Sequence, residues 1–178
     1  VLDGEVDTEA ASDSYDGGAG SDRVSYKIRA HQSLSVDLGS GRESNGLSET
    51  DRIQSFEGTE TGGGNDTVYG EASQARHKYI WTHDGNDVIT AKGLAGVTIA
   101  AGHGDDRIIG SDGADVIGGQ QGNDSISAGD GKDFVSSGPG TDSVRLKDGR
   151  LDTLDCFHTG TDRILSDRID KRLASCRR

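Results

Sequence analysis

Aspartate recurs at a fixed spacing in residues 101–145. Five consecutive blocks of nine residues each have Asp at the sixth place, namely Asp106, Asp115, Asp124, Asp133 and Asp142. The same blocks have Gly at the fourth place, namely Gly104, Gly113, Gly122, Gly131 and Gly140. Carboxylates beside glycine-rich turns, whose backbone carbonyls are accessible, offer the oxygen ligands that Ca²⁺ prefers. Because a fixed period is the signature of a repeat architecture, we expect this chemistry to recur along the chain.

The eighth place of each block predicts the element that positions the carboxylates. It holds a β-branched apolar residue in all five blocks, namely Ile108, Ile117, Ile126, Val135 and Val144. Glycine permits a turn with positive φ, and the residues that follow favour a short strand with one inward side chain. Two blocks therefore make one coil with a strand on each of two faces.

Stacking of such coils would align the aspartates in two rows. Asp106, Asp124 and Asp142 would lie along one edge, and Asp115 and Asp133 along the other. Carboxylates one strand spacing apart, about 4.8 Å, would repel one another. A divalent cation between them removes this repulsion, so we expect calcium between successive coils. The alternative is that these residues only favour turns through local hydrogen bonds, or that the segment is a flexible linker rich in Gly and Asp.

The blocks resemble the RTX family of hemolysin-type calcium-binding repeats, whose pattern is G-G-x-G-x-D-x-U-x with U large and apolar. The resemblance implies an all-β, right-handed parallel β-roll or β-helix that binds several Ca²⁺ ions. It also implies that each ion lies between a turn and the turn two blocks later, with ligands from both carboxylates and from carbonyls of the glycine-rich residues. Asp112 and Asp130, at third places, would add oxygens. Isolated matches elsewhere add Asp22, Asp66 and Asp87 as weaker candidates.

The rest of the chain departs from the nine-residue rhythm. We expect one solenoid over residues 1–178, with an N-terminal coil and irregular insertion at 1–60 and degenerate repeats at 61–100. The regular β-roll follows at 101–145 and a C-terminal cap at 146–178, because solenoids need atypical terminal units. Leu34, Val36 and Leu38 alternate as in a half-buried strand of the insertion. A small separate β domain is the alternative for this region.

Both cysteines, Cys156 and Cys176, lie in the predicted cap. Weak calcium sites need the millimolar calcium found outside the cell, and disulfides persist in that compartment. We therefore expect a secreted chain with a disulfide that closes the C-terminal end. Two separate free thiols are the alternative.

Composition restricts the possible partners. The formal net charge is −12, which argues against nucleic-acid binding, because a nucleic-acid partner requires a basic face. No segment approaches the roughly 20 apolar residues of a membrane helix. Only 30% of the residues are hydrophobic, so we expect metal binding to supply stability that a conventional core cannot. The chain starts at Val1 without Met, and we expect it to be a segment of a larger secreted protein.

Three functional classes follow from these observations. The first is a structural or secretion-linked calcium module that folds on binding Ca²⁺. The second is an enzyme, which we do not expect, because neither a catalytic motif nor a groove of clustered acids is evident. The third is a calcium-dependent module that binds a glycan or protein surface. The five histidines, among them His83 and His103, are scattered and are expected to be surface residues of turns.

Overall fold

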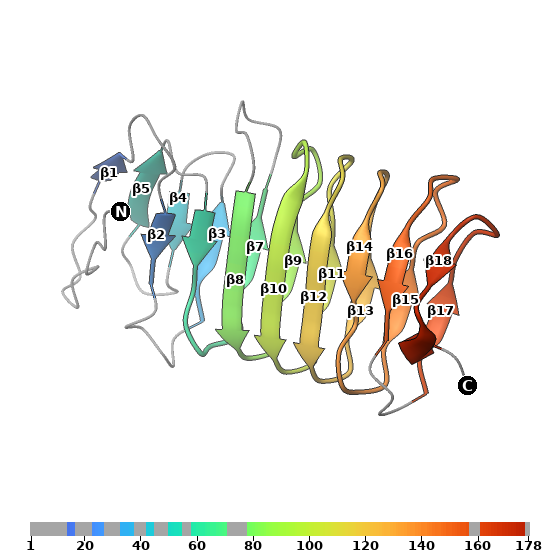
Figure 1. Ribbon diagram of the computed structural model, residues 1–178. Helices are drawn as coiled ribbons and strands as arrows, with labels where there is room; N and C mark the ends of the chain where they lie inside the picture. The colour runs from blue at the N-terminus through green and yellow to red at the C-terminus, as the bar shows by residue number, and fades with distance from the viewer. Residues whose placement is uncertain are drawn as a thin grey trace.

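Two β-sheets packed face to face form the molecule, and from β5 onward the chain passes from one to the other in successive strands (Figure 1). The computed structural model describes residues 14–16, 23–26, 33–37, 42–44, 50–54, 58–70, 78–156 and 161–176. We call the ten-stranded sheet, of order β1-β5-β4-β3-β7-β9-β11-β13-β15-β17, the first sheet. The eight-stranded sheet, of order β18-β16-β14-β12-β10-β8-β6-β2, is the second sheet.

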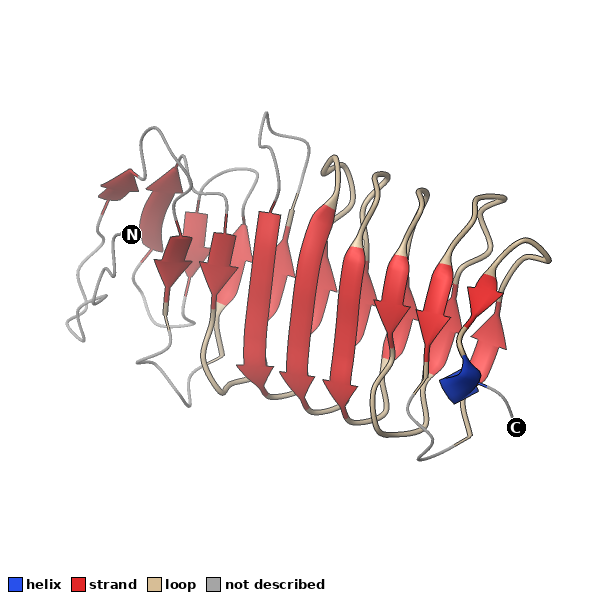
Figure 2. Cartoon of the chain, in the orientation of Figure 1, coloured by secondary structure: helices blue, strands red, loops and turns tan. Residues whose placement is uncertain are grey.

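Most strands are three residues long, as the nine-residue period predicts. The strands of the first sheet are β1 Ser14–Asp16, β3 Ser35–Asp37, β4 Arg42–Ser44, β5 Thr50–Gln54, β7 Thr67–Tyr69, β9 Val88–Thr90, β11 Arg107–Ile109, β13 Ser125–Ser127, β15 Ser143–Arg145 and β17 Arg163–Leu165. Those of the second sheet are β2 Arg23–Ser25, β6 Gly58–Glu60, β8 Lys78–Asp84, β10 Val97–His103, β12 Val116–Gln121, β14 Phe134–Ser136, β16 Thr153–Asp155 and β18 Lys171–Arg172. A 3-10 helix, η1 Ala174–Cys176, is the only helix in the described segments, and no helix there is long and apolar enough to cross a membrane (Figure 2).

The register of the strands places one apolar side chain per strand inside each coil. Ile108 pairs with Ile126 in the first sheet, and Ile117 pairs with Val135 in the second. The eighth-place residues of all five regular blocks are at most 2% exposed, which confirms their predicted inward position. The core is thus two narrow stacks of aliphatic residues between the sheets. An all-β parallel solenoid, as expected, is the fold.

The N-terminal insertion differs from the expected larger coils. Within the first sheet β3 pairs antiparallel with β4, and β4 pairs antiparallel with β5. The solenoid resumes because β3 also pairs in parallel with β7. Leu34 and Val36 are buried as the alternation predicted, whereas Leu38 lies outside the described residues. The insertion therefore extends the first sheet by a local antiparallel ladder, which a period of nine does not predict.

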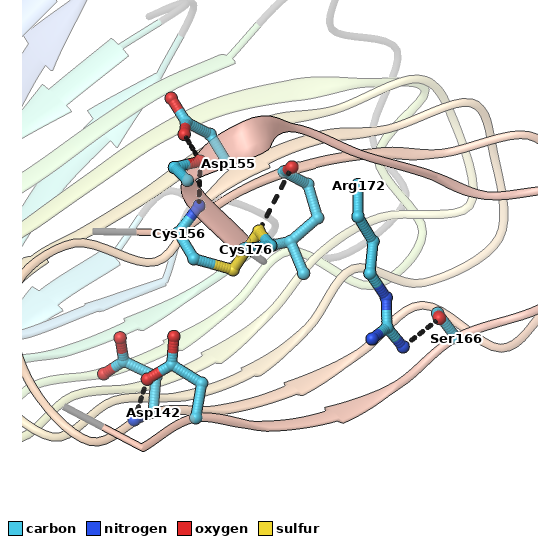
Figure 3. The surroundings of a disulfide bond; sticks show 9 residues. Asp142, Asp155, Cys156, Ser166, Arg172 and Cys176 are labelled. Carbon is cyan, nitrogen blue, oxygen red and sulfur yellow. Dashed lines mark hydrogen bonds between the residues drawn. A yellow bond between two sulfur atoms is a disulfide. The ribbon is translucent and has the colours of Figure 1, made fainter. Parts of the chain in front are cut away.

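A disulfide between Cys156 and Cys176 closes the C-terminal end, as predicted (Figure 3). It ties η1 to the residue that follows β16, and both cysteines pack on the core. The Ser175 hydroxyl adds to this closure, since it donates to the Asp155 carboxylate and accepts the Cys156 N–H at 3.1 Å. Cross-linking a loop of this length contributes about 3 kcal/mol on the chain-entropy model. The last coil is therefore held covalently as well as by strand pairing.

Candidate metal centres

The sixth-place aspartates are buried at the two edges where the sheets meet. Each of the five in the regular blocks is at most 2% exposed, although Asp is almost never fully buried unless its charge is compensated. Asp66, Asp87 and Asp152 are equally buried. The turns that connect the strands therefore point their carboxylates inward, away from solvent.

One row of carboxylates, here called the first column, runs along the edge that precedes the strands of the first sheet. Its members are Asp66, Asp87, Asp106, Asp124, Asp142 and Asp162. The backbone N–H of each member donates to Oδ1 of the member one coil later, at 2.7–3.0 Å. The column begins where the Leu34 N–H donates to Asp66 Oδ1 at 2.9 Å. One oxygen of each carboxylate is thus fixed by the preceding coil.

The second column follows the same rule on the opposite edge. Its members are Asp115, Asp133, Asp152 and Asp170, joined by N–H to Oδ1 bonds of 2.9, 2.9 and 3.2 Å. It starts later in the chain than the first column. One coil earlier the register puts Val97 in place of the carboxylate, and both Val97 and Leu94 of that turn are buried. A Cβ on Gly70 would lie 2.8 Å from Leu94 Cδ1, so an apolar side chain fills this edge upstream of the column.

The second oxygen of most column members lacks a partner. Within the described part of the chain, Oδ2 is buried and accepts no hydrogen bond in Asp66, Asp87, Asp106, Asp124, Asp133, Asp142 and Asp152. A buried carboxylate oxygen without a partner is costly. Among the fully buried members Asp115 is the exception, because Ser111 donates its N–H to Oδ2 at 2.6 Å and its hydroxyl to Oδ1 at 2.5 Å. The row of unsatisfied oxygens is the feature expected of cation ligands.

Glycines keep the space beside these oxygens open. A Cβ on Gly119 would lie 2.4 Å from Asp124 Oδ2 and 2.5 Å from the Ser137 carbonyl oxygen. A Cβ on Gly110 would lie 2.6 Å from Asp115 Oδ2 and 1.9 Å from the Ala128 carbonyl oxygen. Carboxylate and carbonyl oxygens therefore face a space that only glycine leaves free, and this donor set fits Ca²⁺. In the described segments no three His, Cys, Asp or Glu side chains gather into one cluster, so the fit depends on backbone oxygens as well.

Burial raises the pKa values of the carboxyls in the metal-free columns. It raises the pKa of the Asp87, Asp106 and Asp133 carboxyls to about 7, and that of Asp124 to about 6, from an ordinary value of 3.8. Like charges in the same column and in the exposed turns raise them further, while the backbone hydrogen bonds act in the opposite direction. The pKa values of Asp66, Asp115, Asp142 and Asp152 are also raised, chiefly by burial.

Acidification should stabilise the calcium-free fold. Because the folded pKa values near 7 exceed the unfolded value near 3.8, the folded chain binds more protons between these limits. The free energy of unfolding without calcium should therefore rise as the pH falls from about 7.5 to about 4.5, and the gain is complete below about pH 4. Far-UV circular dichroism of chelator-dialysed protein across this range measures it. The calcium-loaded chain should show the opposite trend, since protons compete with the ions. A metal-free β signal that weakens on acidification would contradict the expectation.

A second, exposed ladder lies outside the first column. Side-chain oxygens of Asn65, Asn86, Asp105 and Asn123 accept the backbone N–H of Asn86, Asp105, Asn123 and Thr141 in turn, at 2.7–3.0 Å. Asn or Asp at the fifth place of these first-column turns thus has a structural role in coil stacking. The sequence pattern alone did not indicate it.

The structure places the remaining predicted site residues as follows. Asp66 and Asp87, expected as weaker isolated candidates, continue the first column. Asp112 and Asp130 are exposed at the turns outside the second column. Asp22 lies outside the described residues. Asp152, Asp162 and Asp170 also belong to the columns. Asp152 and Asp162 keep the Asp-x-apolar signature, whereas Asp170 precedes Lys171 and has no such signal.

The fourth-place glycines bring successive turns into contact. Gly122 has φ +141°, and a Cβ there would lie 1.8 Å from the Gly104 carbonyl oxygen. Gly140 and Gly104 make the same approach to the glycine one coil earlier, at 1.7 and 1.8 Å. The fourth-place glycines in this column therefore let the turn carbonyls stack at close range beside the carboxylates.

Gly122→Ala should lower the free energy of unfolding of the calcium-loaded chain by about 2–4 kcal/mol, because backbone strain adds to a clash with a carbonyl that cannot move. Gly149→Ala is the matched control. Gly149 also has positive φ, +85°, but a Cβ there meets nothing within 4 Å. Gly149→Ala should lower the free energy of unfolding only by the backbone strain, about 1–2 kcal/mol. Chemical denaturation in calcium measures both, and equal losses would show that the close approach is unimportant.

Comparison with known families agrees with this geometry. The family model described as the RTX calcium-binding nonapeptide repeat matches in four copies, over residues 60–73, 98–126 and 109–144. The matched segments contain first-column members and the start of the second column. No curated protein and no solved structure matches the chain.

Proposed function

The chain carries RTX calcium-binding nonapeptide repeats, which bind several Ca²⁺ ions, and from this premise we propose that it is a calcium-binding structural module of a larger secreted protein. The proposal adds that the module folds as it binds the ions outside the cell. Repeats of this family are typically structural rather than catalytic, and we assign the chain no enzymatic role.

The buried row of unpartnered Oδ2 atoms is the observation that supports this function most directly. Without a cation, each coil brings a desolvated carboxylate next to another of the same charge. With a cation between them, the same oxygens become ligands, and repulsion between coils becomes attraction. The ions would then take the place of much of the hydrophobic core that the composition lacks.

We propose that the ions lie between successive members of each column. In the regular blocks this pairs Asp106 with Asp124 and Asp124 with Asp142 on one edge, and Asp115 with Asp133 on the other. Carbonyl ligands would come from the glycine-rich turns at Gly104, Gly113, Gly122, Gly131 and Gly140. The hydrogen-bonded continuity of the first column supports extending the sites to Asp66 and Asp87. The site proposed at Asp22 rests on the sequence motif alone.

The extracellular setting is proposed from two properties of the chain. The disulfide between Cys156 and Cys176 is a bond that oxidising compartments maintain. Calcium sites of low affinity are filled at roughly 10⁻⁴–10⁻³ M calcium, the concentration found outside cells, and they stay empty inside cells. We further propose that residues 1–178 act as one module, since strands from β1 to β17 share the first sheet.

Direct counting of bound ions tests the proposal. Equilibrium dialysis of the calcium-depleted chain against buffered calcium should show several ions per chain, with binding complete at about 1 mM. Magnesium at the same concentration should not replace calcium, because its small octahedral shell dehydrates reluctantly. Binding of fewer than two ions per chain at saturating calcium would reject the module proposed here.

A further inference from the structure

A pocket opens on the second sheet, where the longest strands, β8, β10 and β12, reach the turn. It has a volume of about 320 Å³ and is lined by Trp81, His83, Asp84, Gly102, His103 and Gln120, together with Ala100 and Ala101. None of these residues belongs to the aspartate columns. The pocket therefore uses side chains other than the carboxylates of the proposed calcium sites, although His83, Gly102 and Gln120 belong to the same turns.

Two residues of the pocket have an unfavourable backbone conformation. His83 and Gln120 have φ of 68° and 73°, and they are the only non-glycine residues of the described segments with positive φ. Both are in register with Gly102, on either side of it. The following position in this row is Gly138, where a Cβ would lie 1.8 Å from the Gln120 carbonyl oxygen. Glycine adopts the positive φ of this row without strain. The chain nevertheless has a histidine and a glutamine at two positions that line the pocket. Backbone strain that persists at such positions points to function.

Trp81 provides one wall, with its orientation fixed from one side. The Arg23 guanidinium lies 5.2 Å from the indole centroid, and β2 and β6 are on that side of β8. On the other side Trp81 is in register with Ala100, which in turn is in register with Gly118. These small residues leave room beside the half-buried indole. The aromatic wall is thus both rigid and accessible from the pocket.

The polar groups around the wall are also positioned. His83 Nε2 lies 2.7 Å from Oε1 of the buried Glu60, which also accepts the Ser25 hydroxyl at 3.1 Å. Asp84 Oδ1 lies 3.6 Å from His103 Nδ1 at the rim. The pocket therefore combines one aromatic side chain with carboxylate, imidazole and amide groups and with small residues.

This combination matches a pyranose ring, which has an apolar C–H face and a rim of hydroxyl groups. We propose that the pocket binds a neutral pyranose unit of a glycan, with the ring against Trp81 and its hydroxyls bonded by Asp84, His83 and Gln120. An acidic sugar is disfavoured, because no Lys or Arg of the described segments lines the pocket and the chain has a net charge of −12. The adjoining outer positions of the second sheet, Tyr79, Thr98 and Val116, are likewise uncharged.

The single tryptophan of the chain gives the test its signal. Trp81 fluorescence of the calcium-loaded chain should be titrated with cellotetraose, mannotetraose and galactotetraose. At least one should produce a saturable emission change with a dissociation constant of about 1 mM or less, and should protect the indole from acrylamide quenching. No saturable change with any of the three would overturn the proposal. A response to a proline-rich peptide but to none of the sugars would also overturn it.

Variants distinguish this pocket from the rest of the surface. Gln120→Gly matches the native glycine of the same row and relieves the positive φ, so it should fold at least as well and bind the responsive sugar at least tenfold more weakly. Tyr69→Ala removes an exposed aromatic side chain from the first sheet and should leave binding unchanged. Undiminished binding by Gln120→Gly would reject the site. Sugar binding is measured on calcium-loaded protein whose β structure has been confirmed. A lack of sugar binding can therefore be distinguished from a lack of calcium-coupled folding.

Discussion

Removal of calcium with EDTA at about pH 7.5 is expected to abolish most of the β signal in far-UV circular dichroism. The columns then hold ionised carboxylates in a buried, closely spaced row, and the aliphatic stacks are too narrow to oppose this repulsion. A ligand that binds only the folded form stabilises it by RT ln(1 + [L]/Kd) per site, about 2.7 kcal/mol at 100 times Kd. With several sites the sum is comparable to the ~5–15 kcal/mol net stability of ordinary domains. Stepwise addition of calcium should restore the β signal.

Two controls make this result specific. Magnesium at equal ionic strength should not restore the signal, which separates binding from charge screening. The disulfide stays intact in EDTA, so any loss cannot come from reduction of Cys156 and Cys176. A native-like spectrum in EDTA at neutral pH would refute calcium-coupled folding.

Asp124→Asn is expected to have opposite effects with and without calcium. Asn keeps an oxygen for the Asp106 N–H, which donates to Asp124 Oδ1 at 3.0 Å, but it removes the charge. In saturating calcium, the sites on both sides of Asp124 should weaken, with a loss of about 5 kcal/mol if two sites of ~2.7 kcal/mol are lost. Without calcium the variant should be more stable than the parent by up to about 3 kcal/mol, since burial raises the Asp124 pKa to about 6 and each pKa unit is worth ~1.4 kcal/mol.

Asp84→Asn is the matched control, because it removes the same charge from an exposed carboxylate that belongs to neither column and is not among the predicted calcium ligands. It should change stability by about 0.5 kcal/mol or less in either condition. Urea denaturation of the three proteins, with calcium and with chelator at a pH where the metal-free parent retains structure, measures all the differences. Destabilisation of Asp124→Asn by the same amount in both conditions would mean that the side chain serves packing only.

Periodicity predicted most of the solenoid, because each place in the nine-residue block has one physical role. The eighth-place residue is inward wherever the block is intact, as Ile117 and Val144 illustrate. The same phase predicted which aspartates stack together, for example Asp106 with Asp124, and their hydrogen bond confirms it. The calcium ligand assignments themselves stay predictions.

Three features could not be predicted from the period. The antiparallel ladder of β3, β4 and β5 breaks the parallel rule, and a pattern of nine contains no information on strand direction. Asp170 enters the second column by its position in the coil, without the apolar neighbour that marks the other members. The pocket depends on the left-handed backbone of His83 and Gln120, which nothing in their residue types indicates.

The two columns differ in extent, and this has a mechanical consequence. Ionic cross-links in the first column would span from Asp66 to Asp162, whereas the second begins only at Asp115. Coils before that point would be cross-linked by ions along one edge only. Along the other edge they would be held by apolar packing that includes Leu94. A stretching force along the long axis should therefore separate the N-terminal coils first, beginning at the edge that has no ionic cross-links. The coils nearer the disulfide, which are cross-linked along both edges, should stay folded under the same force.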